Sequence, residues 1–120
     1  MDSRTLAGHA ILIVEDEPII SLDLVSAFED AGAIVSTATT IDDAIRMVEQ
    51  SGLSAAILDF GHDSNALCAR LRERGIPFVL HSGYGNTEDD CEGGVVMPKP
   101  AGSGALIETV VRMLPTPIAR

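Results

Sequence analysis

Short apolar segments alternate with amphipathic segments along the chain, and this order constrains the fold more than any other feature. The first and fourth apolar segments are almost uninterrupted, which is typical of parallel strands covered on both faces. Strands that alternate with helices predict a three-layer α/β domain with a parallel sheet. The five predicted strands are His9–Val14, Ala33–Thr37, Ala55–Leu58, Pro77–His81 and Val95–Met97.

Helical patterns fill the intervals between these strands. Pro18 suits the first turn of a helix, and apolar residues then recur with helical periodicity until Gly32. Thr40 is a suitable N-cap for a second helix, which stops at Gly52. Two further helices are predicted at Ser64–Arg74 and Ser103–Leu114.

One helix of the repeating strand–helix pattern is expected to be weak. Residues 83–94 are rich in glycine and acidic residues and have almost no apolar periodicity, so we expect a short or mobile element there. The length of 120 residues suits a single domain with its core between about Ala10 and Leu114.

Composition excludes several classes of function. No apolar run is long enough for a membrane span or a signal-peptide core, so a cytoplasmic protein is expected. A net charge of −10 repels phosphate backbones and argues against direct nucleic-acid binding. Cys68 and Cys91 lack the spacing of a zinc site, and we expect reduced thiols without a disulfide. The histidines show no metal-binding grouping.

Polar side chains follow four of the five predicted strands. Glu15 and Asp16 come after the first, Asp59 after the third, Ser82 after the fourth and Lys99 after the fifth. Because the carboxyl ends of parallel strands meet at one edge of the sheet, we expect these side chains to converge. Each also has an ordinary interpretation alone: a helix cap, a turn serine or a solvated lysine.

Together these groups indicate a metal-assisted phosphoryl site. Three carboxylates held close together need a cation to offset their repulsion. Hard oxygen ligands suit Mg²⁺, or Mn²⁺ in its place. A carboxylate beside such an ion can act as a nucleophile toward phosphorus and form an aspartyl phosphate. The lysine and the serine would then contact phosphoryl oxygens.

With these residues in place, the chain resembles the receiver domain of two-component response regulators. The motifs that carry the resemblance are "ILIVEDEP", "AAILDF", "PFVLHSGYG" and "MPKP". The resemblance implies a doubly wound, flavodoxin-like (βα)5 fold with strand order 2-1-3-4-5. It also implies a signalling domain, not an enzyme with turnover, whose partners are a histidine kinase or histidine phosphotransfer protein and a downstream protein.

The resemblance assigns a role to each site residue. Asp59 is the phosphoacceptor, Asp16 a direct Mg²⁺ ligand and Glu15 a ligand through water. The backbone carbonyl of Gly61 completes the protein's share of the metal shell. Ser82 is the switch hydroxyl, and Lys99 is its ion-pair partner. The peptide bond between Lys99 and Pro100 is expected to be cis.

The chain also departs from the usual receiver pattern. Most receivers place an aromatic residue three positions before the lysine, where this chain has Val96. Its one tyrosine, Tyr84, follows Ser82 by two residues. This resembles a subfamily with a Phe-Ala-Thr-Gly-Tyr motif, often found without an output domain. We therefore expect a stand-alone receiver in which Tyr84 reports or gates phosphorylation, although it could merely pack at a loop edge.

Three other features have mainly ordinary interpretations. His62, three residues after Asp59, could influence hydrolysis of the phosphoryl group, but surface histidines are common. The stretch Glu88–Glu92 is expected to be a solvated face. A solvated helix surface is also expected for Arg70, Arg72, Glu73 and Arg74.

Two alternatives to a phosphorylated receiver remain open. A degenerate receiver would only bind a partner, but the complete set of site residues argues against loss of chemistry. A haloacid-dehalogenase-type phosphatase also uses an aspartate nucleophile and Mg²⁺. That family needs a second aspartate two positions after the nucleophile, where this chain has Gly61, and its nucleophile ends the first strand of the sheet.

Overall fold

The protein is described by a computed structural model that covers residues 5–50, 52–59, 65–82, 91, 93–98 and 102–114. Within these residues, five parallel strands form one sheet in the order β2-β1-β3-β4-β5. The predicted strand order is therefore confirmed. β1 and β3 lie in the interior of the sheet, which explains why their residues are buried on both faces.

Every strand extends one residue further toward its carboxyl end than the sequence pattern predicts. The bounds are Ala10–Glu15 for β1, Ile34–Ala38 for β2, Ala55–Asp59 for β3, Phe78–Ser82 for β4 and Val95–Pro98 for β5. The apolar pattern stops where polar side chains begin, whereas the backbone hydrogen bonds continue for one more residue. Glu15, Asp59 and Ser82 are consequently the last residues of rigid strands, and do not lie in the loops that follow.

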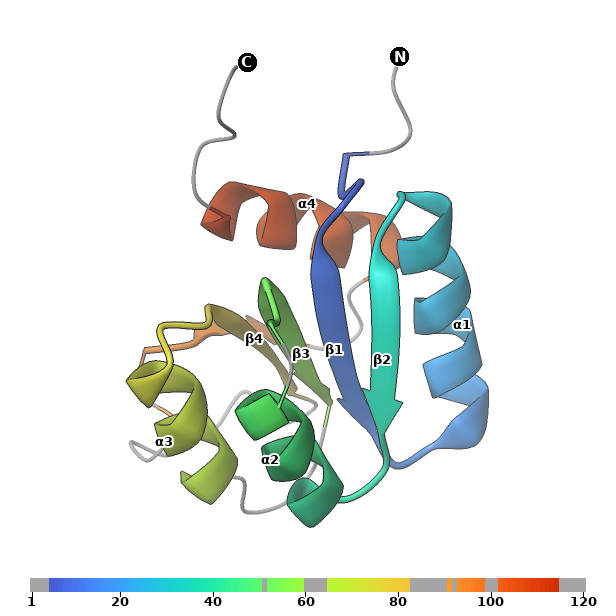
Figure 1. Ribbon diagram of the computed structural model, residues 1–120. Helices are drawn as coiled ribbons and strands as arrows, with labels where there is room; N and C mark the ends of the chain where they lie inside the picture. Colours follow the sequence, from blue (N-terminus) through green and yellow to red (C-terminus); the bar gives the residue numbers. More distant parts are fainter. Residues whose placement is uncertain are drawn as a thin grey trace.

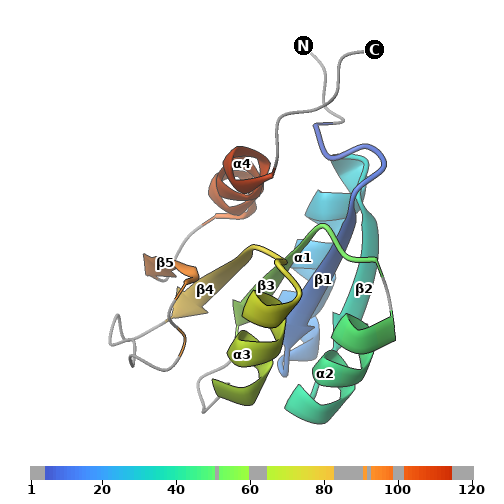
Figure 2. The ribbon, with the colours of Figure 1, turned by 60° about the vertical axis from the view of Figure 1, so that its left-hand side comes forward.

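Helices cover both faces of the sheet, in the predicted three layers (Figures 1 and 2). α1 and α4 contact each other on one side, and α2 and α3 contact each other on the other side. The helices found in the described part of the chain are Pro18–Asp30 for α1, Ile41–Gln50 for α2, Asn65–Glu73 for α3 and Ser103–Met113 for α4. None of them is long and apolar enough to cross a membrane.

The weak helix predicted at residues 83–94 falls mostly outside the described residues. The three described positions there, Cys91, Gly93 and Gly94, have a turn-like backbone before β5 begins at Val95. No α-helix is therefore assigned between β4 and β5 in the part of the chain that the structure describes.

Alternate residues of the central strands point into two separate apolar cores. Ile11 and Ile13 of β1 pack with α1 and α4, whereas Leu12 and Val14 pack with α2 and α3. All four side chains are fully buried. Burial of an aliphatic side chain contributes about 1.5–3 kcal/mol, so the β1 segment anchors both layers at once. Leu6, which precedes β1, joins the α1/α4 core.

The two predicted helix starts differ in their capping. Thr40 caps α2, because its Oγ1 accepts a hydrogen bond from the backbone N–H of Asp43 at 3.1 Å. α1 begins at Pro18 as predicted, and Glu17 at its N-cap position makes no side-chain capping hydrogen bond. The interpretation of Asp16 as a helix cap is therefore wrong, which leaves its carboxylate for another role.

The expectation of unpaired thiols is also wrong. Cys68 of α3 and Cys91 form a disulfide with a Cα–Cα distance of 5.2 Å. The sequence separation of 23 residues carries no recognisable disulfide spacing, but the fold brings the segment before β5 against α3. Gly93 supports the same arrangement, because a Cβ there would lie 3.1 Å from Cδ of Arg72 in α3. Gly94 lies against β4 instead: a Cβ there would lie 2.5 Å from Cε2 of Phe78, so this position admits only glycine without a shift.

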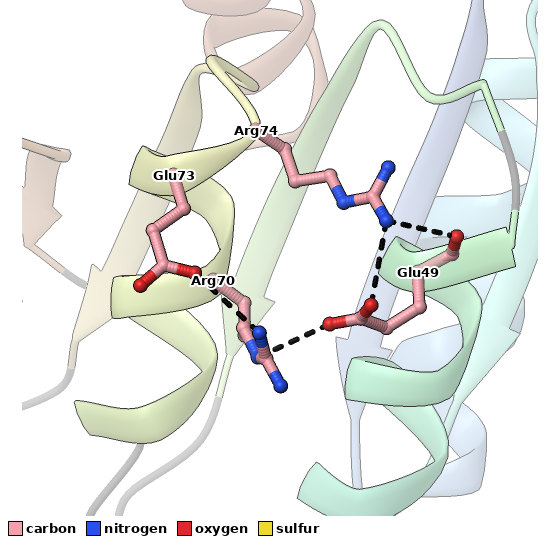
Figure 3. A network of polar contacts seen from close by, with 4 residues as sticks. All are labelled: Glu49, Arg70, Glu73 and Arg74. Atoms are coloured by element: carbon pink, nitrogen blue, oxygen red, sulfur yellow. Dashed lines mark hydrogen bonds and ion pairs between the residues drawn. The ribbon is translucent and has the colours of Figure 1, made fainter.

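Arg70 of α3 and Arg74, which directly follows α3, are more than a solvated surface. Glu49 of α2 accepts ion pairs from Arg70 at 3.1 Å and from Arg74 at 3.3 Å, and Arg70 also pairs with Glu73 at 3.4 Å (Figure 3). This network joins the two helices on one face of the sheet. Its side chains are roughly one-third to two-thirds exposed, so each pair contributes well under about 1 kcal/mol.

Candidate functional site

Two carboxylates lie side by side at the carboxyl ends of the central strands. Glu15 ends β1 and Asp59 ends β3, and the parallel register pairs these two residues directly. Both are only 2 % exposed. Two buried carboxylates in adjacent strands repel each other when both are ionised, so this pair favours a proton or a cation.

The environment of Glu15 opposes its ionisation. Burial, followed by the neighbouring carboxyl of Asp59, raises the pKa of Glu15 to about 8. The backbone N–H of Glu17 opposes this rise by donating a hydrogen bond to Oε2 at 2.8 Å. Oε1 of Glu15 is buried and accepts no hydrogen bond from the described residues. A buried oxygen of this kind is a ready ligand for a cation.

Asp16 follows Glu15 and is exposed where the chain leaves the sheet. Its carboxyl makes a smaller upward contribution to the pKa of Glu15, which places the two acids near one another. Among the residues that the structure describes, no three histidine, cysteine or acidic side chains form a complete metal cluster. The described site therefore offers two buried carboxylates and one exposed carboxylate at its rim.

A third buried polar side chain completes this row, and the sequence pattern did not single it out. Nδ1 of His81 lies 3.0 Å from Oδ2 of Asp59, and the His81 side chain is 8 % exposed. β3 and β4 pair residues that are 22 positions apart, which places His81 beside Asp59 on the same face. Both residues end predicted apolar strands, and the parallel register of β3 and β4 is the signal that could have placed His81 beside Asp59.

Several predicted site residues lie outside the described residues. These are Gly61, His62, Tyr84, Lys99 and Pro100, so their roles and the cis peptide bond stay predictions. For Ser82 only the backbone is described, as the last residue of β4 in register with Pro98 of β5. The strand ends nevertheless bring Ser82 to the same edge of the sheet as Glu15 and Asp59.

Comparison with solved structures gives this arrangement a family context. A response regulator receiver protein from Sinorhizobium medicae WSM419 is 25% identical, over 88% of this chain and 95% of that chain, with a TM-score of 0.74. SdrG from Sphingomonas melonis Fr1 is 29% identical, over 91% and 98%, with a TM-score of 0.70. The chain has the fold of response-regulator receiver domains.

A further solved structure, described as a receiver domain, is relevant to the metal. The receiver domain of the sensor histidine kinase PA1611 from Pseudomonas aeruginosa PAO1 is 22% identical, over 88% of this chain and 97% of that chain, with a TM-score of 0.76. That structure has a magnesium ion coordinated in its active site cleft.

No protein-family model and no curated protein matches this chain. The resemblance to the Phe-Ala-Thr-Gly-Tyr subfamily of receivers stays a prediction.

The described residues of this receiver fold are compatible with a bound Mg²⁺. Mg²⁺ keeps several waters and needs only one or two protein carboxylates. Glu15 presents a buried oxygen without a hydrogen bond from the described residues, and Asp59 lies beside it. A divalent cation would also favour the ionised form of Glu15, whose pKa is raised by burial and then by Asp59.

Proposed function

We propose that this protein is a receiver that accepts a phosphoryl group on Asp59 from a histidine kinase or a histidine phosphotransfer protein. The observation that carries the proposal is the burial of Asp59 at the end of β3, directly beside Glu15. A buried, strand-anchored carboxylate has a fixed orientation, and fixed orientation is the main requirement for in-line phosphoryl transfer.

The proposed metal site consists of Asp16, Asp59, Glu15 through water, and the carbonyl of Gly61. When bound, Mg²⁺ or Mn²⁺ would neutralise charge that develops on the phosphoryl oxygens. The chain's own contribution is to hold two of these carboxylates out of bulk water at adjacent strand ends. Lys99 and Ser82 are proposed to contact the phosphoryl oxygens from the ends of β5 and β4.

The proposed reaction forms one bond and breaks one bond. An oxygen of the Asp59 carboxylate bonds to phosphorus while the bond between phosphorus and the donor's imidazole nitrogen breaks. The leaving imidazole takes up a proton from solvent. The product is an aspartyl phosphate, whose added charge alters the face presented to a downstream protein. The protein would thereby switch protein–protein interactions or drain phosphate from a shared kinase.

The exposed apolar side chains of α1 suit a protein donor. Ile19 is 76% exposed and Leu22 is 69% exposed, and both lie in the first half of the helix that follows Asp16. The donor's phosphohistidine must reach Asp59, so the donor has to cover residues beside the carboxyl end of β1. We therefore assign the first turns of α1 to contact with the phosphodonor protein.

The decisive experiment is intact-mass measurement after incubation with Mg²⁺ and acetyl phosphate. The native chain is expected to gain one phosphoryl group, and Asp59→Asn is expected to gain none. Asp30→Asn is the matched control, because Asp30 is an exposed carboxylate at the far end of α1. An unchanged mass for the native chain would refute the phosphoacceptor role and favour a receiver that only binds a partner.

The phosphatase alternative receives no support from the described residues. Asp59 ends the third strand in chain order, whereas that family places its nucleophile after the first strand. Steady hydrolysis of a generic phosphomonoester would be the outcome that revives it. A role without an output domain stays a prediction.

A further inference from the structure

Asp59 has a buried hydrogen-bonding partner that the proposed phosphoryl chemistry does not use. His81 comes from β4, and its Nδ1 lies 3.0 Å from Oδ2 of Asp59. The Asp59 side chain is fully buried and that of His81 is 8 % exposed. The sheet fixes the positions of Asp59 and His81 relative to each other, because Asp59 belongs to β3 and His81 to the adjacent, paired strand β4.

The direction of this hydrogen bond follows from the chemistry of the two groups. An ionised carboxylate only accepts hydrogen bonds, so when Asp59 is ionised this contact requires a proton on Nδ1 of His81, which donates to Oδ2. Both the neutral ring with its proton on Nδ1 and the imidazolium satisfy this requirement. Only the neutral ring with its proton on Nε2 lacks this donor.

We infer that His81 shortens the lifetime of the aspartyl phosphate by stabilising the carboxylate that leaves when the phosphoryl group is hydrolysed. This inference rests on the proposed function of Asp59. In hydrolysis, a water oxygen bonds to phosphorus, the bond between phosphorus and Oδ1 breaks, and its electron pair returns to the carboxylate. The proton from water leaves with the inorganic phosphate or passes to solvent.

The sign of the effect follows from the charge on Oδ2. In the aspartyl phosphate, Oδ2 is the carbonyl oxygen of a neutral acyl group and accepts hydrogen bonds weakly. In the free carboxylate, Oδ2 shares a full negative charge, and the N–H of His81 makes a charge-assisted hydrogen bond about twice as strong. The contact therefore strengthens as the phosphoryl group departs, which lowers the barrier to hydrolysis.

The test measures how fast the phosphorylated protein loses its phosphoryl group after the phosphodonor has been removed. His81→Leu has no donor at this position and should lengthen the half-life roughly fivefold to tenfold, the difference between a charge-assisted and a neutral hydrogen bond. His81→Asn should return the half-life close to the native value, because its amide nitrogen branches from the same position along the side chain as Nδ1.

A second histidine provides the matched control. His9 precedes β1 at the opposite end of the sheet, and its Nδ1 lies 3.0 Å from Oγ of Ser54. His9→Leu also removes a partly buried ring and its hydrogen bond, but it should leave the half-life unchanged. If His81→Leu and the native protein lose phosphate at the same rate, or if His9→Leu changes the half-life as much, the inference is wrong.

A spectroscopic measurement tests the same contact without phosphorylation. In the unmodified protein, ¹⁵N NMR should show a protonated Nδ1 for His81, and the signal should shift in Asp59→Asn. An unprotonated Nδ1 would overturn the inference even if His81→Leu failed to fold. Absence of any label on the native protein would overturn the proposed function and this inference together. Labelling with an unchanged half-life in His81→Leu would overturn the inference alone.

Discussion

Glu15 and Asp59 are direct neighbours in the parallel register of β1 and β3, and both are almost completely buried. Without a cation, this relationship opposes ionisation of Glu15, whose pKa is raised from 4.5 to about 8 by burial and then by Asp59. The two carboxylates are therefore suitable ligands for a metal ion, but holding both of them ionised without a metal ion is unfavourable.

The stability of the metal-free protein is expected to fall as pH rises from about 5 to about 8. In this range Glu15 is ionised in the unfolded chain but still protonated in the folded protein, because its folded pKa is about 8. The folded state thus binds more protons, and the free energy of unfolding decreases with pH until both states are ionised. The loss attributable to Glu15 should reach a few kcal/mol at most.

Glu15→Gln isolates this effect, because the amide cannot ionise. Urea unfolding in the presence of a chelator should show a flatter pH dependence for Glu15→Gln than for the native protein. Mg²⁺ should stabilise the native protein most above pH 8, where the carboxylates are ionised and can bind the metal. Equal slopes for the two proteins would show that Glu15 does not retain its proton in the fold.

Reduction of the disulfide should lower stability and leave the sheet intact. The bond between Cys68 and Cys91 closes a separation of 23 residues. A cross-link over a loop of this length stabilises by about 3 kcal/mol, mainly by restricting the unfolded chain. Alkylation and mass measurement should find no free thiol without reductant, and dithiothreitol should lower the unfolding midpoint.

Cys91→Ala is the control for the disulfide, because it should unfold at the same midpoint with or without dithiothreitol. Free thiols in the non-reduced native protein would contradict the pairing of Cys68 with Cys91.

Leu22→Lys should separate contact with the donor protein from the chemistry at Asp59. Leu22 is 69% exposed on α1, so the substitution should change stability by less than about 0.5 kcal/mol. Phosphoryl transfer from a histidine kinase or phosphotransfer protein should slow by tenfold or more, whereas labelling by acetyl phosphate should stay at the native rate.

Ser26→Lys provides the comparison, since Ser26 is exposed further along the same helix. Equal slowing with both donors would mean that Leu22 acts on the site itself and not on the docking of a protein.

Two glycines should respond to alanine with opposite signs. A Cβ at Gly94 would lie 2.5 Å from the buried ring of Phe78, so Gly94→Ala should destabilise the protein by about 1–3 kcal/mol. Gly104 lies in α4, and no atom of the described residues around the helix comes within 4 Å of such a Cβ, so Gly104→Ala should stabilise by up to about 1 kcal/mol. Denaturant midpoints measure both changes. A stabilising Gly94→Ala would mean that residues 93–98 do not pack against Phe78 as described.

The positions of the carboxylates could be predicted because they depend on local sequence. Apolar runs that end in Glu15 and Asp59 define both the strands and their carboxyl ends, and parallel strands bring those ends to one edge. The start of α1 at Pro18 and the cap at Thr40 are equally local features. The alternation of apolar strands and amphipathic helices, with acidic residues at the strand ends, determines the fold class and the residue types of the candidate site.

The contacts across the sheet depended on the tertiary structure. His81 faces Asp59 only because β4 pairs with β3 in one register, and a shift by one residue would turn its ring to the other face. Cys68 meets Cys91 because the segment before β5 packs against α3, a distant contact that no residue spacing encodes. The sequence alone determined which chemistry the strand ends carry, whereas register and helix packing decided which side chains touch it.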